Sequence, residues 1–271
     1  MAMITLISAK GSPGVTTSIA ALAYRWPRPV LVADCDPSGG DLAMGWLARY
    51  WLNGWLRRDR GLLSFVTATR HDGDMNPNKD ISVHAQPVPD TAHARILVGI
   101  TEPSQLAAVG AEGWRRVASS LAQLPAGQQV DVLVDCGQYG PTTPSSLIAA
   151  ADLVLLVVRP THRHLQAARA TADLLRRQVP QQRLGMAMTS ATTAGLVAAR
   201  DVLRLPCGLA LPHGPGPAAV FSDGVEARGI DRSRLVRAAG QAAQHLSDTL
   251  YPRTLAQPRT ARAMQAAGAR S

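Results

Sequence analysis

The residues with the clearest chemical meaning form a glycine-containing loop near the start of the chain, Ser8-Ala-Lys-Gly-Ser-Pro-Gly-Val-Thr-Thr-Ser18. An apolar run at 4–7 precedes it and an Ala/Leu-rich stretch at 19–23 follows, which predicts a strand-to-helix junction. Backbone N–H groups and the helix dipole favour a phosphate there. An ordinary phosphate-binding loop ends in Gly-Lys-Ser/Thr, whereas this one has Gly14, Val15 and Thr16. Thr16 keeps the hydroxyl that binds Mg²⁺ in such loops, whereas Val15 replaces the lysine and its ammonium group. The alternative interpretation of the segment is a connecting turn that binds no ligand.

Carboxylates follow two further strand patterns. The pattern at 30–33 ends in Asp34 and Asp36, and the pattern at 130–134 ends in Asp135. Parallel strands bring their carboxyl ends to one edge of a sheet, so we expect these side chains beside the phosphates of a ligand held by the loop. Carboxylates in that position can hold Mg²⁺ or orient water.

The loop resembles the deviant Walker A motif of the ParA/MinD family, K-G-G-x-G-K-[ST]-T. The match lies at Lys10, Gly11, Gly14, Thr16 and Thr17, while Ser12 and Val15 depart from it. The resemblance implies that Lys10 reaches the nucleotide bound by the partner subunit of a dimer. Lys10 and Lys79 are the only lysines, and a lysine kept here in an arginine-rich chain favours a function. The nucleotide-binding residues that the resemblance implies are Lys10, Gly11, Ser12, Pro13, Gly14, Val15, Thr16 and Thr17.

The other motifs occur in the family's order. Asp34 to Pro37 resembles the Walker A′ segment D-x-D-P, residues 130–137 resemble Walker B, and 151–161 resembles the family segment that follows. The resemblance implies catalytic roles for Lys10 and for Asp36, which would orient the attacking water. It implies Mg²⁺ binding by Asp34 and Asp135, and Thr16 would add its hydroxyl. The implied cofactors are ATP or ADP, bound weakly or not at all, and Mg²⁺.

Apolar strand patterns alternate with helical patterns along the chain, which predicts an α/β fold with a doubly wound, mostly parallel sheet of seven to eight strands, as in P-loop NTPases. Residues 1–251 are expected to form a single domain, and the basic, Ala-rich residues 252–271 a flexible tail. Strands are expected at 3–8, 29–34, 95–99, 130–135, 152–158, 184–189 and 207–211, with a weaker one at 81–85. Long helices are expected at 106–124, 164–178 and 233–250.

Composition limits the environment and the partners. The net charge is +9 and the pI about 10.4, and the arginines are scattered, which favours either an ordinary solvated surface or non-specific DNA binding. The three cysteines show no metal spacing. No signal peptide or membrane-spanning run is found, so we expect a cytoplasmic protein.

Two features near the motifs allow more than one interpretation. Trp46, Trp51 and Trp55 occur at helical spacing, which is typical of a helix packed on the sheet and also fits a partner surface. His213 follows a strand where relatives contact the adenine base, or else is an exposed loop histidine.

The expected function is that of a ParA/MinD-like positioning or partition factor with a degenerate nucleotide site. It would form a homodimer and bind a protein partner of a partition, pilus or secretion system in a nucleotide-dependent way. The alternative is a pseudo-ATPase, a non-catalytic scaffold for a secretion, pilus or conjugation assembly. Hydrolysis is expected to be very weak or absent, because Val15 removes a charge that stabilises the transferring phosphoryl group.

Overall fold

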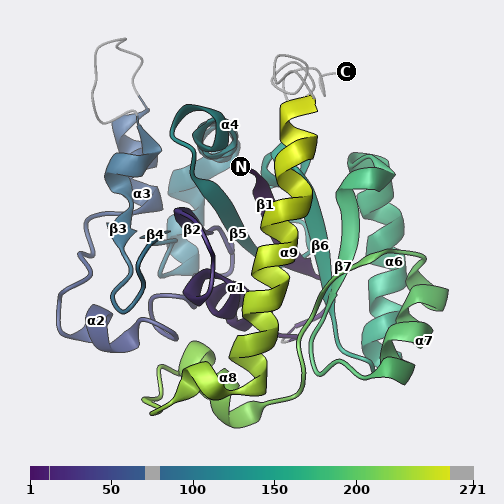
Figure 1. Cartoon of the computed structure of the whole chain (residues 1–271). Coiled ribbons are helices and arrows are strands. Elements are labelled where there is room, and N and C mark those ends of the chain that lie inside the picture. Colours follow the sequence, from purple (N-terminus) through teal and green to yellow (C-terminus); the bar gives the residue numbers. More distant parts are fainter. Residues whose placement is uncertain (12, 71–79, 257–271) are drawn as a thin grey trace.

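Figure 1 shows the computed structural model of the chain, which describes residues 1–11, 13–70 and 80–256. Within these residues the strands form one eight-stranded sheet in the order β3-β4-β2-β5-β1-β6-β7-β8. Neighbouring strands pair in parallel except β3 and β4. The expected doubly wound α/β fold is confirmed, because the chain places strands on both sides of β1 and covers both faces with helices.

The strands are β1 (Met3–Ser8), β2 (Val30–Asp34), β3 (Gln86–Pro87), β4 (Ala94–Leu97), β5 (Asp131–Gln138), β6 (Leu153–Val158), β7 (Leu184–Met188) and β8 (Cys207–Ala210). The α-helices are α1 (Val15–Tyr24), α2 (Ala48–Leu52), α3 (Leu62–Ala68), α4 (Leu106–Gly127), α5 (Ser145–Ala150), α6 (His162–Gln178), α7 (Thr193–Leu203), α8 (Pro215–Ser222) and α9 (Arg234–Ala256). Short 3₁₀ helices lie at Ile81–His84, Pro103–Gln105, Gln181–Arg183 and Ile230–Arg232.

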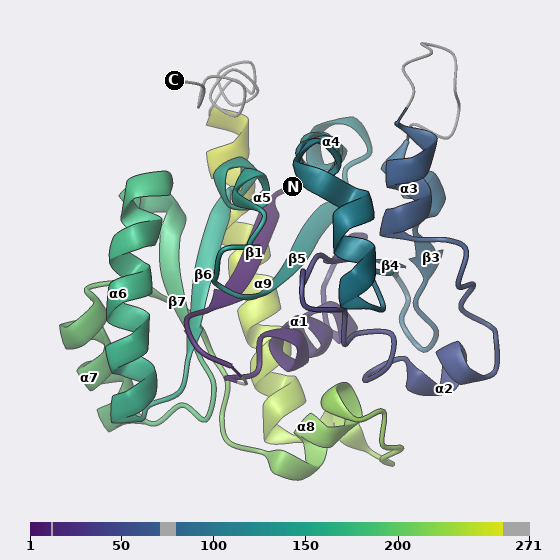
Figure 2. The same cartoon turned by 180° about the vertical axis from the view of Figure 1, so that it is seen from behind.

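Helices cover both faces of the sheet. Helices α1, α8 and α9 lie on the face turned to the viewer in Figure 1, and α3 to α7 lie on the face seen in Figure 2. Each helix layer packs on the sheet through its own buried apolar cluster. Because both faces are covered, the central strands read as near-continuous apolar runs, as in β6.

Two buried carboxylates act at the amino ends of the strands, opposite the predicted site. Asp131 accepts hydrogen bonds from the Ala2 N–H (2.7 Å) and from Trp26 Nε1 (2.9 Å). Asp152 accepts one from the Met3 N–H (2.8 Å). These bonds fix the start of β1 against β5 and β6, so a buried aspartate in this fold is not by itself a sign of chemistry.

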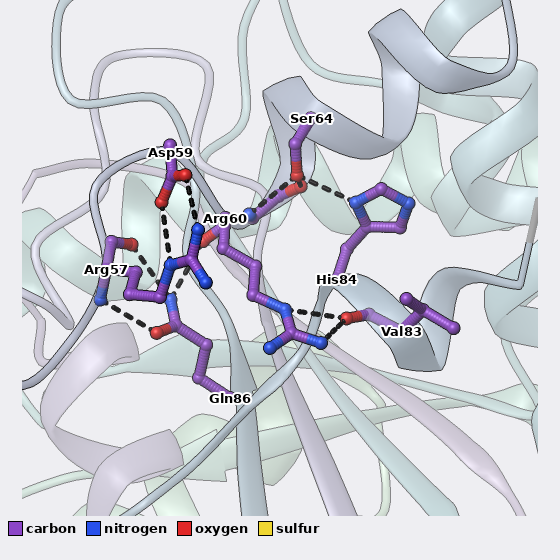
Figure 3. A network of polar contacts seen from close by, with 8 residues as sticks. Arg57, Asp59, Arg60, Ser64, Val83, His84 and Gln86 are labelled. Carbon is purple, nitrogen blue, oxygen red and sulfur yellow. Dashed lines mark hydrogen bonds and ion pairs between the residues drawn. The ribbon is translucent and has the colours of Figure 1, made fainter. Parts of the chain in front are cut away.

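The arginine-rich turn at 57–60 is held from inside by Gln86, which is 4% exposed (Figure 3). Its Nε2 donates to the carbonyls of Arg57 (3.0 Å) and Arg60 (2.8 Å), and its Oε1 accepts from the Arg57 N–H (2.8 Å). The Arg57 guanidinium pairs with Asp59, and that of Arg60 donates to the Val83 carbonyl. Both guanidinium groups therefore have partners within the protein.

The structure differs from the expected elements first at 81–85. Residues Ile81–His84 form a 3₁₀ helix, and the short strand β3 follows it. The Asp80 side chain accepts a hydrogen bond from the Ser82 N–H, which closes a tight turn where an extended strand was expected.

The tryptophan segment and the C-terminal region also differ from expectation. Within 41–59 only Ala48–Leu52 is α-helical. Gly45 packs where a Cβ would lie 2.6 Å from the Ser222 carbonyl oxygen, and Gly54 has φ 77°, so turns bound a short helix. Helix α9 extends to Ala256, past residue 252 at which the tail was expected to begin; residues 257–271 lie outside the described part.

Candidate functional site

The three predicted motifs meet at one edge of the sheet. Strand β1 lies between β5 and β6, and its carboxyl end leads into the loop before α1. Asp34, the last residue of β2, is the register partner of Asp135, which lies three residues before the end of β5, and the Cys35 N–H donates to the Asp135 carbonyl (2.8 Å). This is the lower edge of the sheet in Figures 1 and 2. Parallel pairing therefore brings the loop and both carboxylate motifs together.

The loop turns into α1 at Gly14, whose φ of 100° is a conformation that favours glycine. The Ser18 N–H (3.0 Å) and Oγ (2.6 Å) both donate to the Gly14 carbonyl. Lys10 and Gly11 are exposed, whereas Pro13 is buried; Ser12 lies outside the described residues. The loop therefore leads directly into the first turn of α1, where backbone N–H groups and the helix dipole favour a phosphate, and the phosphate-binding role of its residues stays a prediction.

Val15, in the position of the missing lysine, is 6% exposed and belongs to the apolar cluster beneath α1 and α9. It is the first residue of α1, and Thr16 and Thr17 follow it as half-buried residues. The position therefore serves core packing and brings no charge to the loop.

The carboxyl group of Asp135 is strongly perturbed by its surroundings. It is 1% exposed, and burial raises its pKa to about 7, although hydrogen bonds from the Thr16 side chain and the Gly137 N–H act in the opposite direction. The Gly137 bond is 2.8 Å long. The contact brings Thr16 and Asp135, which were both predicted to bind Mg²⁺, together.

Asp34 lies beside Asp135 and is also 1% exposed. Its Oδ2 accepts from the Leu42 N–H (3.3 Å), while its Oδ1 is buried with no hydrogen-bond partner in the described part of the chain. Burial and then the charge of Asp135 raise the pKa of Asp34 well above its usual range. Two adjacent buried carboxylates with an unpartnered oxygen are an environment that a cation would relieve.

The residues present therefore fit Mg²⁺. Among the residues that the structure describes, no cluster of three or more His, Cys, Asp or Glu side chains is arranged to hold a metal ion. Mg²⁺ in nucleotide sites commonly takes one or two carboxylates and completes its shell with phosphates and water. Thr16, Asp34 and Asp135 would supply such a partial shell.

Asp36 lies next to Gly137 in a contact that leaves no room for a side chain. Asp36 is half-buried, its Oδ1 accepts from the Ser38 N–H (2.8 Å), and burial raises its pKa. A Cβ on Gly137 would lie 2.0 Å from Asp36 Oδ2, and Gly137 has φ 60°. Glycine at 137 therefore allows the carboxylate of the A′ motif to sit against the end of β5.

Thr189 was not found by sequence reasoning. Its Oγ1 donates to the Pro13 carbonyl (2.5 Å) and lies 3.4 Å from the Val158 carbonyl oxygen. It joins the loop after β1 to the ends of β6 and β7. The available signal was its position as the last residue of the strand pattern at 184–189, one residue past the end of β7.

The remaining expectations have mixed outcomes. Trp51 is 7% exposed and belongs to the core, Trp46 is half-buried, and Trp55 is 49% exposed. The core interpretation is confirmed for Trp51, and a partner surface at Trp55 stays a prediction. His213 is exposed, and its Nδ1 lies 3.2 Å from Ser190 Oγ, so its contact with a base also stays a prediction.

The fold is similar to that of several solved structures. A ParA family ATPase from Chlorobium tepidum aligns with a TM-score of 0.67 and 16% identity over 90% of this chain and 99% of that one. MinD from Pyrococcus horikoshii, complexed with Mg-ADP, aligns with a TM-score of 0.70 and 18% identity over 90% and 95%. The chain has the ParA/MinD fold. The Aquifex aeolicus MinC:MinD complex also aligns, with a TM-score of 0.66 and 16% identity over 92% and 96%.

The ParA/MinD fold was recognisable from motifs although overall sequence similarity is low. No protein-family model matches the sequence, and neither does any curated protein. The expected resemblance is confirmed at the level of a ParA/MinD-like P-loop fold. In the part of the chain that the structure describes, no helix is both long and apolar enough to cross a bilayer.

Proposed function

We propose that this protein is a ParA/MinD-like positioning or partition factor with a degenerate nucleotide site. It binds Mg²⁺–ATP or ADP weakly at the described edge of the sheet, dimerises in a nucleotide-influenced way and then binds its partner. The main support is one combination: Thr16, Asp34, Asp36 and Asp135 converge beside the loop while Val15 lies in the apolar core.

Each residue has a role that follows from its surroundings. Thr16, Asp34 and Asp135 would hold Mg²⁺, which when bound neutralises phosphate charge. The backbone at Gly11 to Thr17 would hold the phosphates. Asp36 is half-buried, and its carboxylate is positioned by the hydrogen bond from the Ser38 N–H, so it would orient water. Lys10 is exposed and would reach the phosphates from the surface of the loop.

The compared structures support nucleotide and protein partners. The Pyrococcus horikoshii MinD is complexed with Mg-ADP, and the Aquifex aeolicus MinD is complexed with MinC. By this likeness we propose a homodimer in the cytoplasm and a protein partner of a partition, pilus or secretion system. The basic composition supports non-specific DNA as a further partner, and binding that weakens steeply with salt would test it.

The second candidate is the non-catalytic scaffold, and the burial of Val15 favours it. A lysine ammonium at that position would stabilise the charge that grows on the transferring phosphoryl group, and its loss affects turnover more than binding. Removing one preorganised charge commonly costs roughly 10² to 10³ in rate. A scaffold would keep the fold and the dimer without turnover.

Steady-state ATP hydrolysis, measured over a range of protein concentrations, separates the two candidates. The positioning factor gives slow turnover that rises with protein concentration and is lost in Lys10→Ala and in Asp36→Ala. No turnover at any concentration, with nucleotide-dependent dimerisation retained, supports the scaffold. Turnover at the rate of an intact P-loop enzyme that is insensitive to Lys10→Ala contradicts both.

A further inference from the structure

The loop before α1 has a basic neighbour on the β6 side. Strands β1 and β6 pair in parallel, with Ser8 opposite Val157. The residues that follow each strand therefore leave the sheet side by side: the loop with Lys10 after β1, and the turn with Arg159 before α6. Thr189 links the two segments through the carbonyls of Pro13 and Val158.

Three cations in this region have no counter-ion within the described part of the chain. Lys10, Arg159 and Arg163 are exposed, and none of their side chains forms a hydrogen bond or ion pair with another described residue. Arg176, on the same helix α6, differs in that its guanidinium pairs with Asp173 (2.6 Å). Unpaired like charges repel one another, so an anion bound among them would relieve that repulsion.

The side chain of His164 lies near the three cations. It is 4% exposed, and its ring forms no hydrogen bond with the described residues. Burial, and then the charges of Arg163, Arg159 and Lys10, lower the pKa of His164, which places all three charges near the ring. A neutral imidazole can donate one hydrogen bond to an anion bound beside it.

The start of α6 adds to this arrangement. Its first turn contains no acidic residue, and the Thr161 side chain does not cap it, so the N–H groups of that turn are not used by a cap. The helix is long enough for its dipole to favour an anion at this end.

We propose that Arg159 and Arg163, together with Lys10, bind the phosphates of a nucleoside polyphosphate at the loop and supply the positive charge that Val15 does not. The inference rests on the nucleotide binding proposed above. A guanidinium pairs with two phosphate oxygens at once, so a pair of arginines can replace one ammonium. The phosphates belong either to the nucleotide of the same chain or to that of a second copy.

The test uses calorimetry with Mg²⁺–ATP, Mg²⁺–ADP and AMP on the full chain. The variants are Arg159→Ala, Arg163→Ala and the double change, and the control is Arg169→Ala, an exposed arginine further along α6. The double variant is expected to bind ATP roughly 10- to 100-fold more weakly, which is the net effect of losing about one charge-assisted hydrogen bond, with a smaller loss for AMP. The control keeps wild-type affinity, and circular dichroism checks that every variant is folded.

Concentration and a second substitution identify the source of the phosphates and the role of the charge. If the double variant loses ATP affinity at concentrations where the protein is monomeric, the arginines bind the chain's own nucleotide. If it loses affinity only at concentrations where the protein is dimeric, they bind the nucleotide of the second copy. In both cases Val15→Lys added to the double variant recovers affinity, because it returns a cation to the loop.

Three results overturn the inference. Equal ATP affinity of wild type, the double variant and the control refutes it and leaves the proposed nucleotide binding intact. Unchanged ATP affinity with weakened duplex-DNA binding assigns the cluster to the DNA backbone instead. Absence of ATP binding in both wild type and Val15→Lys refutes the inference and the proposed function together.

Discussion

Replacing Asp135 with asparagine should stabilise the protein at neutral pH while removing a carboxylate that is proposed to bind Mg²⁺. Burial raises the pKa of Asp135 from its ordinary 3.8 to about 7. A carboxyl whose pKa is higher in the folded than in the unfolded state takes up a proton on folding. Its contribution to the unfolding free energy therefore falls as the pH rises between those two pKa values. With 1.36 kcal/mol for each pKa unit, the ionised group costs about 4 kcal/mol of unfolding free energy above pH 7.

Urea unfolding between pH 4 and pH 8, followed by tryptophan fluorescence, measures this effect. Asparagine has nearly the same shape and still accepts from the Gly137 N–H. Asp135→Asn is therefore expected to match wild type near pH 4 and to exceed it by up to about 4 kcal/mol at pH 8. The control is Asp173→Asn, an exposed carboxylate paired with Arg176, which should change stability by less than about 1 kcal/mol. A pH-independent difference, or a less stable Asp135→Asn at pH 8, would refute the reasoning.

Other contacts give separate predictions. Thr189→Val removes the hydroxyl that donates to the Pro13 carbonyl in the loop before α1. If that loop binds ATP as proposed, the affinity measured by calorimetry should fall roughly tenfold at little cost in stability, and unchanged affinity would exclude this role for Thr189. Gln86→Leu leaves three backbone groups at 57–60 without partners and should lower the unfolding free energy by about 2–4 kcal/mol in urea, with a loss below about 0.5 kcal/mol counting against it. Burial raises the pKa of the Cys35 and Cys136 thiols, so a thiol reagent at pH 8 should label the half-buried Cys207 first, and equal rates would contradict this.

The site was predictable from sequence where strand geometry alone fixes it. Asp34 and Asp135 stand at the ends of strand patterns, and parallel pairing brings those ends together whatever the helices do. The same reasoning placed the loop before α1. The pKa values of these carboxylates could not be predicted, because they depend on burial by segments such as the turn at Leu42.

The remaining features depend on contacts between distant residues. Thr189 lies 176 positions from Pro13, and their contact arises only because β7 follows β6 in the sheet. The helical spacing of Trp46 to Trp55 predicted a helix over the whole segment, and this was wrong. Close packing at Gly45 and the positive φ of Gly54 limit the helix to Ala48–Leu52. Periodicity reports which residues prefer the core, and such close contacts determine where a helix can continue.

Calorimetric titration of Mg²⁺–ATP into wild type, Thr16→Ala and Val15→Lys tests the central claim most directly. A degenerate site that relies on Thr16 and the loop backbone predicts weak binding to wild type, weaker or no binding to Thr16→Ala, and stronger binding to Val15→Lys. The last variant must move a side chain out of the apolar cluster, so it should also be less stable without nucleotide and regain stability when nucleotide is added. Tight binding to wild type that Thr16→Ala leaves unchanged would contradict the account.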